Sequence, residues 1–127
     1  IEWCRSQSGD PLLIEGVGGW AVPLTESLTV EDLAIAMALP VIIVAANRLG
    51  MLNHTLLTVE AIRESGLNIA GIVVNNAFGE PSALKQWNES DIRRWVGPTT
   101  GVTTIERFEG EGQFGIVGTD IINALGL

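Results

Sequence analysis

Two continuous apolar runs limit the fold of this chain more than any other feature. Val41–Ala46 reads VIIVAA and Ala70–Val74 reads AGIVV, and neither run alternates with polar residues. Such runs are typical of strands that are buried on both faces of a parallel sheet. Parallel neighbours need a crossover connection, which is usually a helix. We therefore expect strand–helix–strand units in an α/β layer fold.

Helical patterns lie between the apolar runs. The segment from Leu52 to Ser65 carries an apolar stripe, with the remaining side chains facing away, and Gly66 ends it. The stripe comprises Leu52, Leu56, Val59 and Ile62, and the outward set comprises Thr55, Thr58, Arg63 and Glu64. An earlier helix begins after Thr29, a good N-cap, and stops before Pro40.

Other segments complete the expected order. A more polar helix covers residues 81–95, a short helix covers 120–125, and the Gly- and Thr-rich stretch Thr99–Thr119 reads as loop. Leu12–Ile14 reads as a short buried strand. The crossovers should be right-handed, and Glu15, Asn47 and Asn75 should share the rim where the strands end. Because three strands would leave apolar edges bare, we expect part of the domain to lie upstream of these residues.

Composition excludes several function classes. The 127 residues have a net charge of −8 and no basic stripe, which argues against a nucleic-acid partner. No apolar stretch approaches the ~20 residues that span a membrane. The lone Cys4 excludes an internal disulfide and fits a reducing compartment, so a cytoplasmic location is expected. The single lysine, Lys85, is not part of a GxxxxGK[ST] loop.

The segment LLIEGVGGWAVPL, residues 12–24, is the strongest candidate for ligand chemistry. An acid where a strand emerges, followed by glycines, suits magnesium and nucleotide phosphate. Glu15 is the candidate metal ligand, and Gly16, Gly18 and Gly19 remove side chains where a ligand would approach the backbone. The alternative is that the glycines only supply a backbone turn with positive φ.

Two further candidates follow the later strands. Gly50, Met51, Leu52 and Asn53 open a helix, and their free amides would form an anion site; alternatively, Asn53 is an ordinary N-cap. Asn75 and Asn76 offer donors and acceptors that match an adenine edge, although spacing alone favours the alternative of an Asx turn at the end of the strand. His54 is interpreted as structural.

These residues resemble a known family. LLIEGVGGWAVPL and TVEDLAIAMALPVIIVAANRLGMLNHTLLTVEAIRESGLNIAGIVVNN are similar to the carboxyl-terminal part of dethiobiotin synthetase, without a gap from about Leu12 to Asn76. The signatures that carry the resemblance are EGxGG…PL and LGxxNHxLLT. The resemblance implies a homodimer and an α/β fold with a three-layer parallel sheet of P-loop NTPase type. It further implies that residues 1–127 are a single partial domain, which lacks the amino-terminal half of that fold. It also implies a ligase that uses ATP and Mg²⁺ to close the ureido ring of dethiobiotin from 7,8-diaminopelargonate and CO₂, a step of biotin biosynthesis.

The resemblance also implies roles for single residues. Glu15 would help to hold magnesium, and Gly16 to Gly18 would border the nucleotide. Gly50 to Asn53 would receive the substrate carboxylate across the dimer interface. Asn75, with Asn76 beside it, would bind adenine.

The chain departs from the family in two respects. The phosphate loop and its lysine are not among these residues, so we expect no turnover from this chain alone and assign no catalytic residue to it. Glu106 stands where the family usually has a proline, which puts adenine contacts from Glu106 to Phe108 and Gln113 in doubt. Two alternatives remain: a non-catalytic nucleotide-binding or dimerisation module, and a relative of the cobyrinate-type amide synthases.

Overall fold

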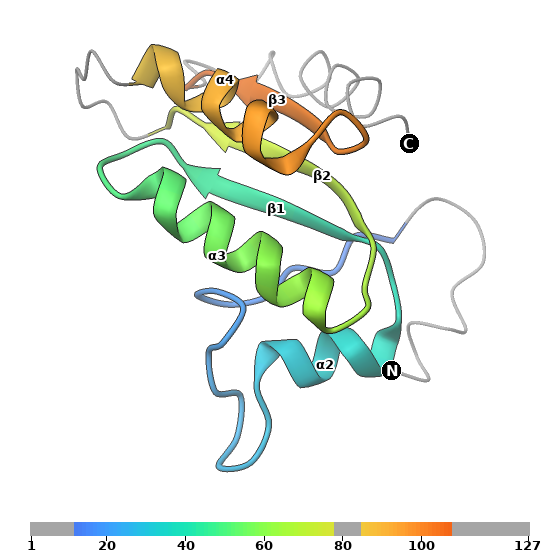
Figure 1. Ribbon diagram of the computed structural model, residues 1–127. Coiled ribbons are helices and arrows are strands. Elements are labelled where there is room, and N and C mark those ends of the chain that lie inside the picture. The colour runs from blue at the N-terminus through green and yellow to red at the C-terminus, as the bar shows by residue number, and fades with distance from the viewer. Residues whose placement is uncertain (1–11, 78–84, 108–127) are drawn as a thin grey trace. The chain divides into compact units, whose positions relative to one another are not determined.

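The computed structural model describes residues 12–77 and 85–107 of the chain (Figure 1). Its contacts gather the residues into two compact units, one up to Leu39 and one from Pro40 onward. Each unit is described below by itself.

A parallel sheet forms the centre of the second unit. Its strands are β1 (Val41–Ala46), β2 (Ile69–Asn75) and β3 (Gly101–Ile105), in the order β1-β2-β3. Both neighbouring pairs are parallel. The helix α3 (Met51–Glu64) connects β1 to β2, and α4 (Lys85–Val96) precedes β3. The expected α/β fold with a parallel sheet is therefore confirmed.

The core lies between this sheet and its two helices. Ile43, Ile72 and Val102 are partners across the three strands, and all are buried. Figure 1 shows α3 running along β1 and α4 lying near β3, and each helix also contacts the other. Ile62 of α3 and Ile92 of α4 are fully buried. Burial of these apolar side chains is the main force that holds the helices to the sheet.

The two predicted apolar strands differ in how completely they are buried. Residues 71–74 of β2 are all buried, as their continuous apolar sequence predicts. In β1, Val44 is 63% exposed, so the expectation of burial on both faces is wrong for this strand. Within the described residues β1 pairs with β2 alone, and an outer strand gains less cover from its neighbours than a central one.

The prediction of loop throughout Thr99–Thr119 is wrong at β3. The strand Gly101–Ile105 reads GVTTI and pairs with β2 from Gly71 to Asn75. Thr103 and Thr104 are β-branched, and such side chains favour extended backbone, although Gly and Thr are also common in turns. Local composition therefore allows both strand and loop, and pairing with β2 selects the strand.

The helix α3 buries a stripe that differs from the predicted one. Its buried residues are Met51, Thr55, Val59 and Ile62. Thr55, which was expected to face away, is 3% exposed. Met51, Thr55 and Val59 are spaced four residues apart and share one face, so the face that is buried is rotated toward Met51 and Thr55 relative to the predicted stripe.

In the first unit, α2 (Val30–Met37) has the predicted N-cap. Thr29 and Asp32 form a capping box: the Asp32 amide donates to Thr29 Oγ1 over 3.2 Å, and the Thr29 amide donates to Asp32 Oδ2 over 2.7 Å. The backbone and side-chain hydrogen bonds from Thr29 lower the pKa of the Asp32 carboxyl. Ala38, in a left-handed conformation, ends this helix before Pro40.

The strand predicted at Leu12–Ile14 is not present. These residues have no assigned secondary structure, and Leu13 is 82% exposed. A run of three apolar residues becomes a strand only when another backbone pairs with it, and no described residue does so. Glu15 therefore does not follow a strand here.

Two expectations extend beyond the described residues. The helix predicted over residues 81–95 is confirmed from Lys85 onward and ends at Val96. Residues 81–84 and the short helix predicted at 120–125 lie outside the described residues.

Candidate functional site

Polar residues gather at one edge of the sheet, where the parallel strands end. Asn47 follows β1, Asn75 ends β2 and Asn76 comes next, and Glu106 follows β3. Because the strands are parallel, these positions share the edge that binds ligands in open α/β sheets. The prediction that Asn47 and Asn75 lie on one rim is therefore confirmed.

Side-chain hydrogen bonds join this edge into one chain of groups. Asn88 of α4 donates from Nδ2 to Asn47 Oδ1 over 2.7 Å. Asn47 donates from Nδ2 to Asn76 Oδ1 over 2.6 Å. Asn76 in turn donates from Nδ2 to Glu106 Oε1, also over 2.6 Å. We call these four residues the amide chain. The amide chain runs from Asn88 through Asn47, which is 1% exposed, to the exposed Glu106.

Backbone hydrogen bonds hold the same strand ends in register. The Asn47 amide donates to the Asn75 carbonyl over 2.8 Å, and the Asn76 amide donates to the Ile105 carbonyl over 2.9 Å. Asn75 Oδ1 accepts the Ala77 amide over 2.9 Å, which is the Asx turn that the sequence allowed. No acceptor for Asn75 Nδ2 is recorded within the described part of the chain, so this amide can still donate to a ligand.

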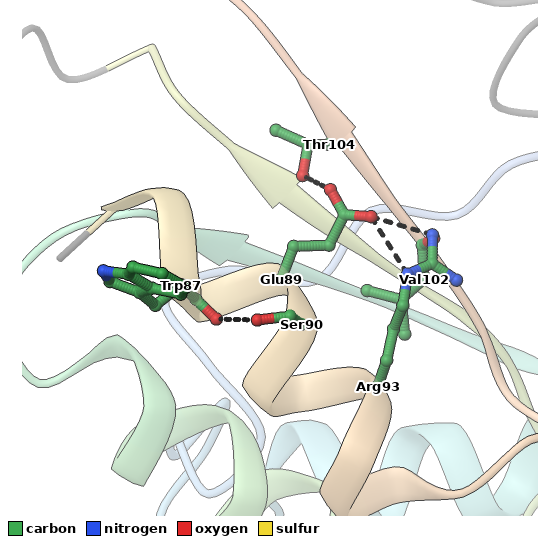
Figure 2. A network of polar contacts seen from close by, with 6 residues as sticks. All are labelled: Trp87, Glu89, Ser90, Arg93, Val102 and Thr104. Atoms are coloured by element: carbon green, nitrogen blue, oxygen red, sulfur yellow. Dashed lines mark hydrogen bonds and ion pairs between the residues drawn. The ribbon is translucent and has the colours of Figure 1, made fainter.

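A second polar network fastens α4 to β3 (Figure 2). Arg93 donates to Glu89 Oε1 from Nε over 3.0 Å and from Nη2 over 2.8 Å, and Nη2 also donates to the Val102 carbonyl. Thr104 donates its hydroxyl to Glu89 Oε2. Partial burial alone would raise the pKa of the Glu89 carboxyl, but the bonds from Thr104 and Arg93 outweigh it, and the pKa is lowered. The charged carboxylate is thus the form that holds β3 against the helix.

The start of α3 follows the end of β1. Gly50 is the N-cap residue, with φ at +86°, a conformation that favours glycine. The interpretation of Asn53 as N-cap is wrong, since the helix begins at Met51 and Asn53 lies within its first turn. The free amide expected at Met51 is also absent, because that amide donates to the Arg48 carbonyl over 3.0 Å. Among the described residues, the backbone N–H groups of Leu52 and Asn53 have no hydrogen-bond acceptor.

The predicted glycine loop belongs to the first unit. Glu15, Gly16, Val17 and Gly18 are all exposed. Gly18 has φ at +78°, which supports the interpretation of a backbone turn. A Cβ at Gly16 would meet Val30 Cγ1 at 3.2 Å, so a larger residue there would press on the first turn of α2. That Glu15 shares a rim with Asn75 stays a prediction.

Two further features of the described residues concern metal binding and membrane insertion. Across the described ranges, no group of three or more His, Cys, Asp or Glu side chains is arranged to hold a metal ion. Nor is any helix in those ranges long and apolar enough to cross a membrane.

Comparison with known proteins now decides the family. The sequence profile of the AAA domain family matches residues 4–119, which is most of the chain. The chain belongs to the AAA domain family. The parallel sheet with helices, described above, fits this P-loop NTPase-like family.

Individual proteins that are similar to this chain carry the name expected from the motifs. The ATP-dependent dethiobiotin synthetase of Cellvibrio japonicus is 44% identical over 102 residues, covering 79% of this chain and 45% of that protein. The synthetase of the same name from Bacillus licheniformis is 44% identical over 92 residues, covering 72% and 39%. The resemblance to dethiobiotin synthetase is confirmed, and the chain spans less than half the length of these curated relatives.

Sequence reasoning missed part of the candidate site of this AAA domain. Asn88 and the pairing of Glu106 with Asn76 were not predicted, since their contacts join residues 41 and 30 positions apart in the chain. One available signal was the polarity of Asn88 within a helix whose neighbouring Ile92 is fully buried. A polar residue one helical turn from a core residue favours a buried hydrogen bond.

Proposed function

We propose that these residues form part of an ATP-dependent dethiobiotin synthase, which closes the ureido ring of 7,8-diaminopelargonate with CO₂ in biotin biosynthesis. The observation that carries the proposal is the 44% identity over 102 residues with a protein of that name. The fold alone would not support it, because one fold serves many activities.

The proposed reaction proceeds in three steps. One amine of the substrate adds to CO₂ and loses a proton, which gives a carbamate. A carbamate oxygen attacks the γ-phosphorus of ATP, and ADP leaves. The second amine then attacks the carbonyl carbon of this mixed anhydride, the ring closes, and phosphate leaves with the second proton lost to solvent. Such phosphoryl transfer depends on positioning and on groups that stabilise the developing charge.

The proposed binding groups for the substrate carboxylate and for the adenine of ATP lie in the second unit. Asn75, with Asn76 beside it, would bind the adenine of ATP through its side-chain amide. Gly50 to Asn53 would receive the substrate carboxylate, with the amides of Leu52 and Asn53 as its donors, since the Met51 amide is already engaged.

Glu15 of the first unit is the proposed Mg²⁺ ligand. Its carboxylate is exposed, and carboxylate oxygen is the donor that Mg²⁺ prefers. Mg²⁺ commonly takes only one or two protein carboxylates and completes its shell with waters and phosphates, so a lone Glu15 fits this role. The ion would neutralise charge that develops on the phosphates. Gly16, Val17 and Gly18 would border the nucleotide.

The proposal assigns this chain the carboxyl-terminal part of the enzyme, as a single partial domain. Because the 127 residues contain no GxxxxGK[ST] loop, the isolated chain is proposed to be inactive. The whole enzyme is proposed to be a cytoplasmic homodimer.

The test compares two proteins made from the same gene. One is the complete reading frame that contains these residues, and the other is the 127-residue chain. Each receives 7,8-diaminopelargonate, ATP, Mg²⁺ and bicarbonate, and dethiobiotin is measured by mass spectrometry. We expect ring closure from the complete frame and none from the chain. If the protein encoded by the complete frame binds ATP but does not close the ring, the non-catalytic module is favoured. Turnover by the isolated chain would contradict its assignment as one part of the enzyme.

A further inference from the structure

The amide chain Asn88–Asn47–Asn76–Glu106 has a single direction. We propose that Asn88, Asn47 and Glu106 are positioning residues for Asn75, and that the Glu106 carboxylate sets the direction of every amide in the chain. This inference rests on the proposed function, in which Asn75 binds the adenine of ATP. It assigns roles to three residues that contact no proposed ligand.

The direction follows from what each group is able to donate. An ionised carboxylate only accepts hydrogen bonds, so Asn76 must turn its Nδ2 toward Glu106. Asn76 Oδ1 then faces Asn47, which must donate from its own Nδ2. Asn47 Oδ1 is left to accept from Asn88 Nδ2. One charge at the surface thereby fixes the orientation of three amides, each of which has two orientations of nearly equal shape.

The amide chain is linked to Asn75 by backbone hydrogen bonds. The Asn47 amide donates to the Asn75 carbonyl, and the amide of the next residue, Asn76, donates to the Ile105 carbonyl, so the two bonds fix the backbone at and directly after the residue that would bind the nucleobase. Both polar atoms of the Asn76 side chain are engaged within the chain. The group left to reach a nucleobase is therefore Nδ2 of Asn75, whose Oδ1 is held by the Ala77 amide. Asn76 links Glu106 to Asn47 within the amide chain, beside this group.

A reversal at one end provides the test. In Asn88→Asp, the new carboxylate at position 88 only accepts, so Asn47 has to turn its Nδ2 toward it. Asn76 then has to turn as well, and its Oδ1 meets the Glu106 carboxylate, acceptor against acceptor. Glu106→Gln relieves this conflict, because a glutamine amide is able to donate to that oxygen. The double variant Asn88→Asp/Glu106→Gln should therefore recover what the single variant loses.

The measurement is made on the complete reading frame, with KM for ATP, kcat, and the dissociation constant of ATP·Mg from calorimetry. We expect Asn88→Asp to weaken ATP binding and raise KM for ATP roughly ten-fold, with a much smaller effect on kcat. In the double variant, KM for ATP and the dissociation constant of ATP·Mg should both lie within roughly three-fold of their values in the unaltered protein. Asn68→Asp is the matched control, since it makes the same chemical change at an exposed residue just before β2 and should leave both constants unchanged.

The outcomes separate the two proposals. If the unaltered protein does not bind ATP, the proposed function fails. If it binds ATP, and Asn88→Asp has no effect or the double variant is at least as weak as the worse single variant, the positioning chain is overturned while the function stands. Should Asn88→Asp not fold, Glu106→Lys tests the chain from its exposed end. Its ammonium faces a donor on Asn76, so KM for ATP should rise even though the new charge attracts ATP, and an unchanged or lower KM would overturn the inference.

Discussion

Asn47 is 1% exposed and donates its side-chain amide to Asn76 Oδ1 across 2.6 Å, which joins the ends of β1 and β2 by side chains as well as by backbone. Buried amides of this kind stabilise a fold only when both of their polar atoms are engaged. The edge of the sheet that carries the candidate site is therefore also a source of stability.

Replacement of Asn47 by alanine should destabilise the second unit. The change leaves Asn76 Oδ1 and Asn88 Nδ2 without their partner and opens a small cavity, which together cost about 2–3 kcal/mol in the free energy of unfolding. Urea unfolding followed by circular dichroism measures this loss. Asn68→Ala, at an exposed position, is the control and should change stability by less than about 0.5 kcal/mol. Equal losses in the two variants would contradict a structural role for the amide chain.

The network around Glu89 should make stability depend on pH in acid. The pKa of the Glu89 carboxyl is lowered from its ordinary value of 4.5, so the charged form is favoured in the folded state. Its contribution is complete above the unfolded-state pKa and is lost as the pH falls through the folded-state pKa. Urea midpoints measured from pH 7 down to pH 3 should therefore fall less steeply for Glu89→Gln than for the unaltered protein.

The matched control for this experiment is Glu60→Gln. Glu60 is an exposed carboxylate on α3, and its replacement should leave the slope of stability against pH unchanged. A Glu89→Gln profile that runs parallel to that of the unaltered protein would show that the bonds from Thr104 and Arg93 do not stabilise the charged form.

Gly50 and Gly66 form a natural pair of test positions at the two ends of α3. Their φ angles are +86° and +77°, so alanine at either position should cost about 1 kcal/mol of stability through backbone strain. Only Gly50 belongs to the proposed carboxylate site. In the complete enzyme, Gly50→Ala should raise KM for 7,8-diaminopelargonate, whereas Gly66→Ala should not. Equal KM values in the two variants would count against that site.

Glu15→Gln should weaken the dependence of activity on magnesium in the complete enzyme. The substitution removes the charge but keeps the shape, so the apparent Mg²⁺ constant should rise several-fold while the protein stays folded. A magnesium titration of ring closure at saturating ATP measures the constant. An unchanged titration curve would exclude Glu15 as a metal ligand.

The sequence pattern correctly predicted those elements that depend only on residues close together in the sequence. Val41–Ala46 is confirmed to the residue, and α2 has its predicted cap at Thr29, because apolar continuity and capping are properties of neighbours in the sequence. The prediction at Leu12–Ile14 is wrong and β3 was missed for one reason. A strand is defined by the backbone that pairs with it, and that partner is distant in the sequence.

The candidate site divides in the same way. Topology was sufficient to predict that Asn47 and Asn75 lie at one edge of the sheet. The partners of Asn76 could not be predicted, because Glu106 reaches it only through β3, a segment whose local sequence pattern indicates loop. The start of α3 was wrong by a single residue, and that was enough to change the roles expected for Met51 and Asn53.

The helix α4 is fastened along its whole described length. Asn88 ties its first turns to the end of β1, Arg93 and Glu89 tie its middle to β3, and Arg63 of α3 donates to the Val96 carbonyl at its last residue over 2.7 Å. Between Asn88 and Val96 the helix is thus tied to both outer strands of the sheet and to α3. When a ligand binds, this part of α4 should therefore move with the sheet as one block.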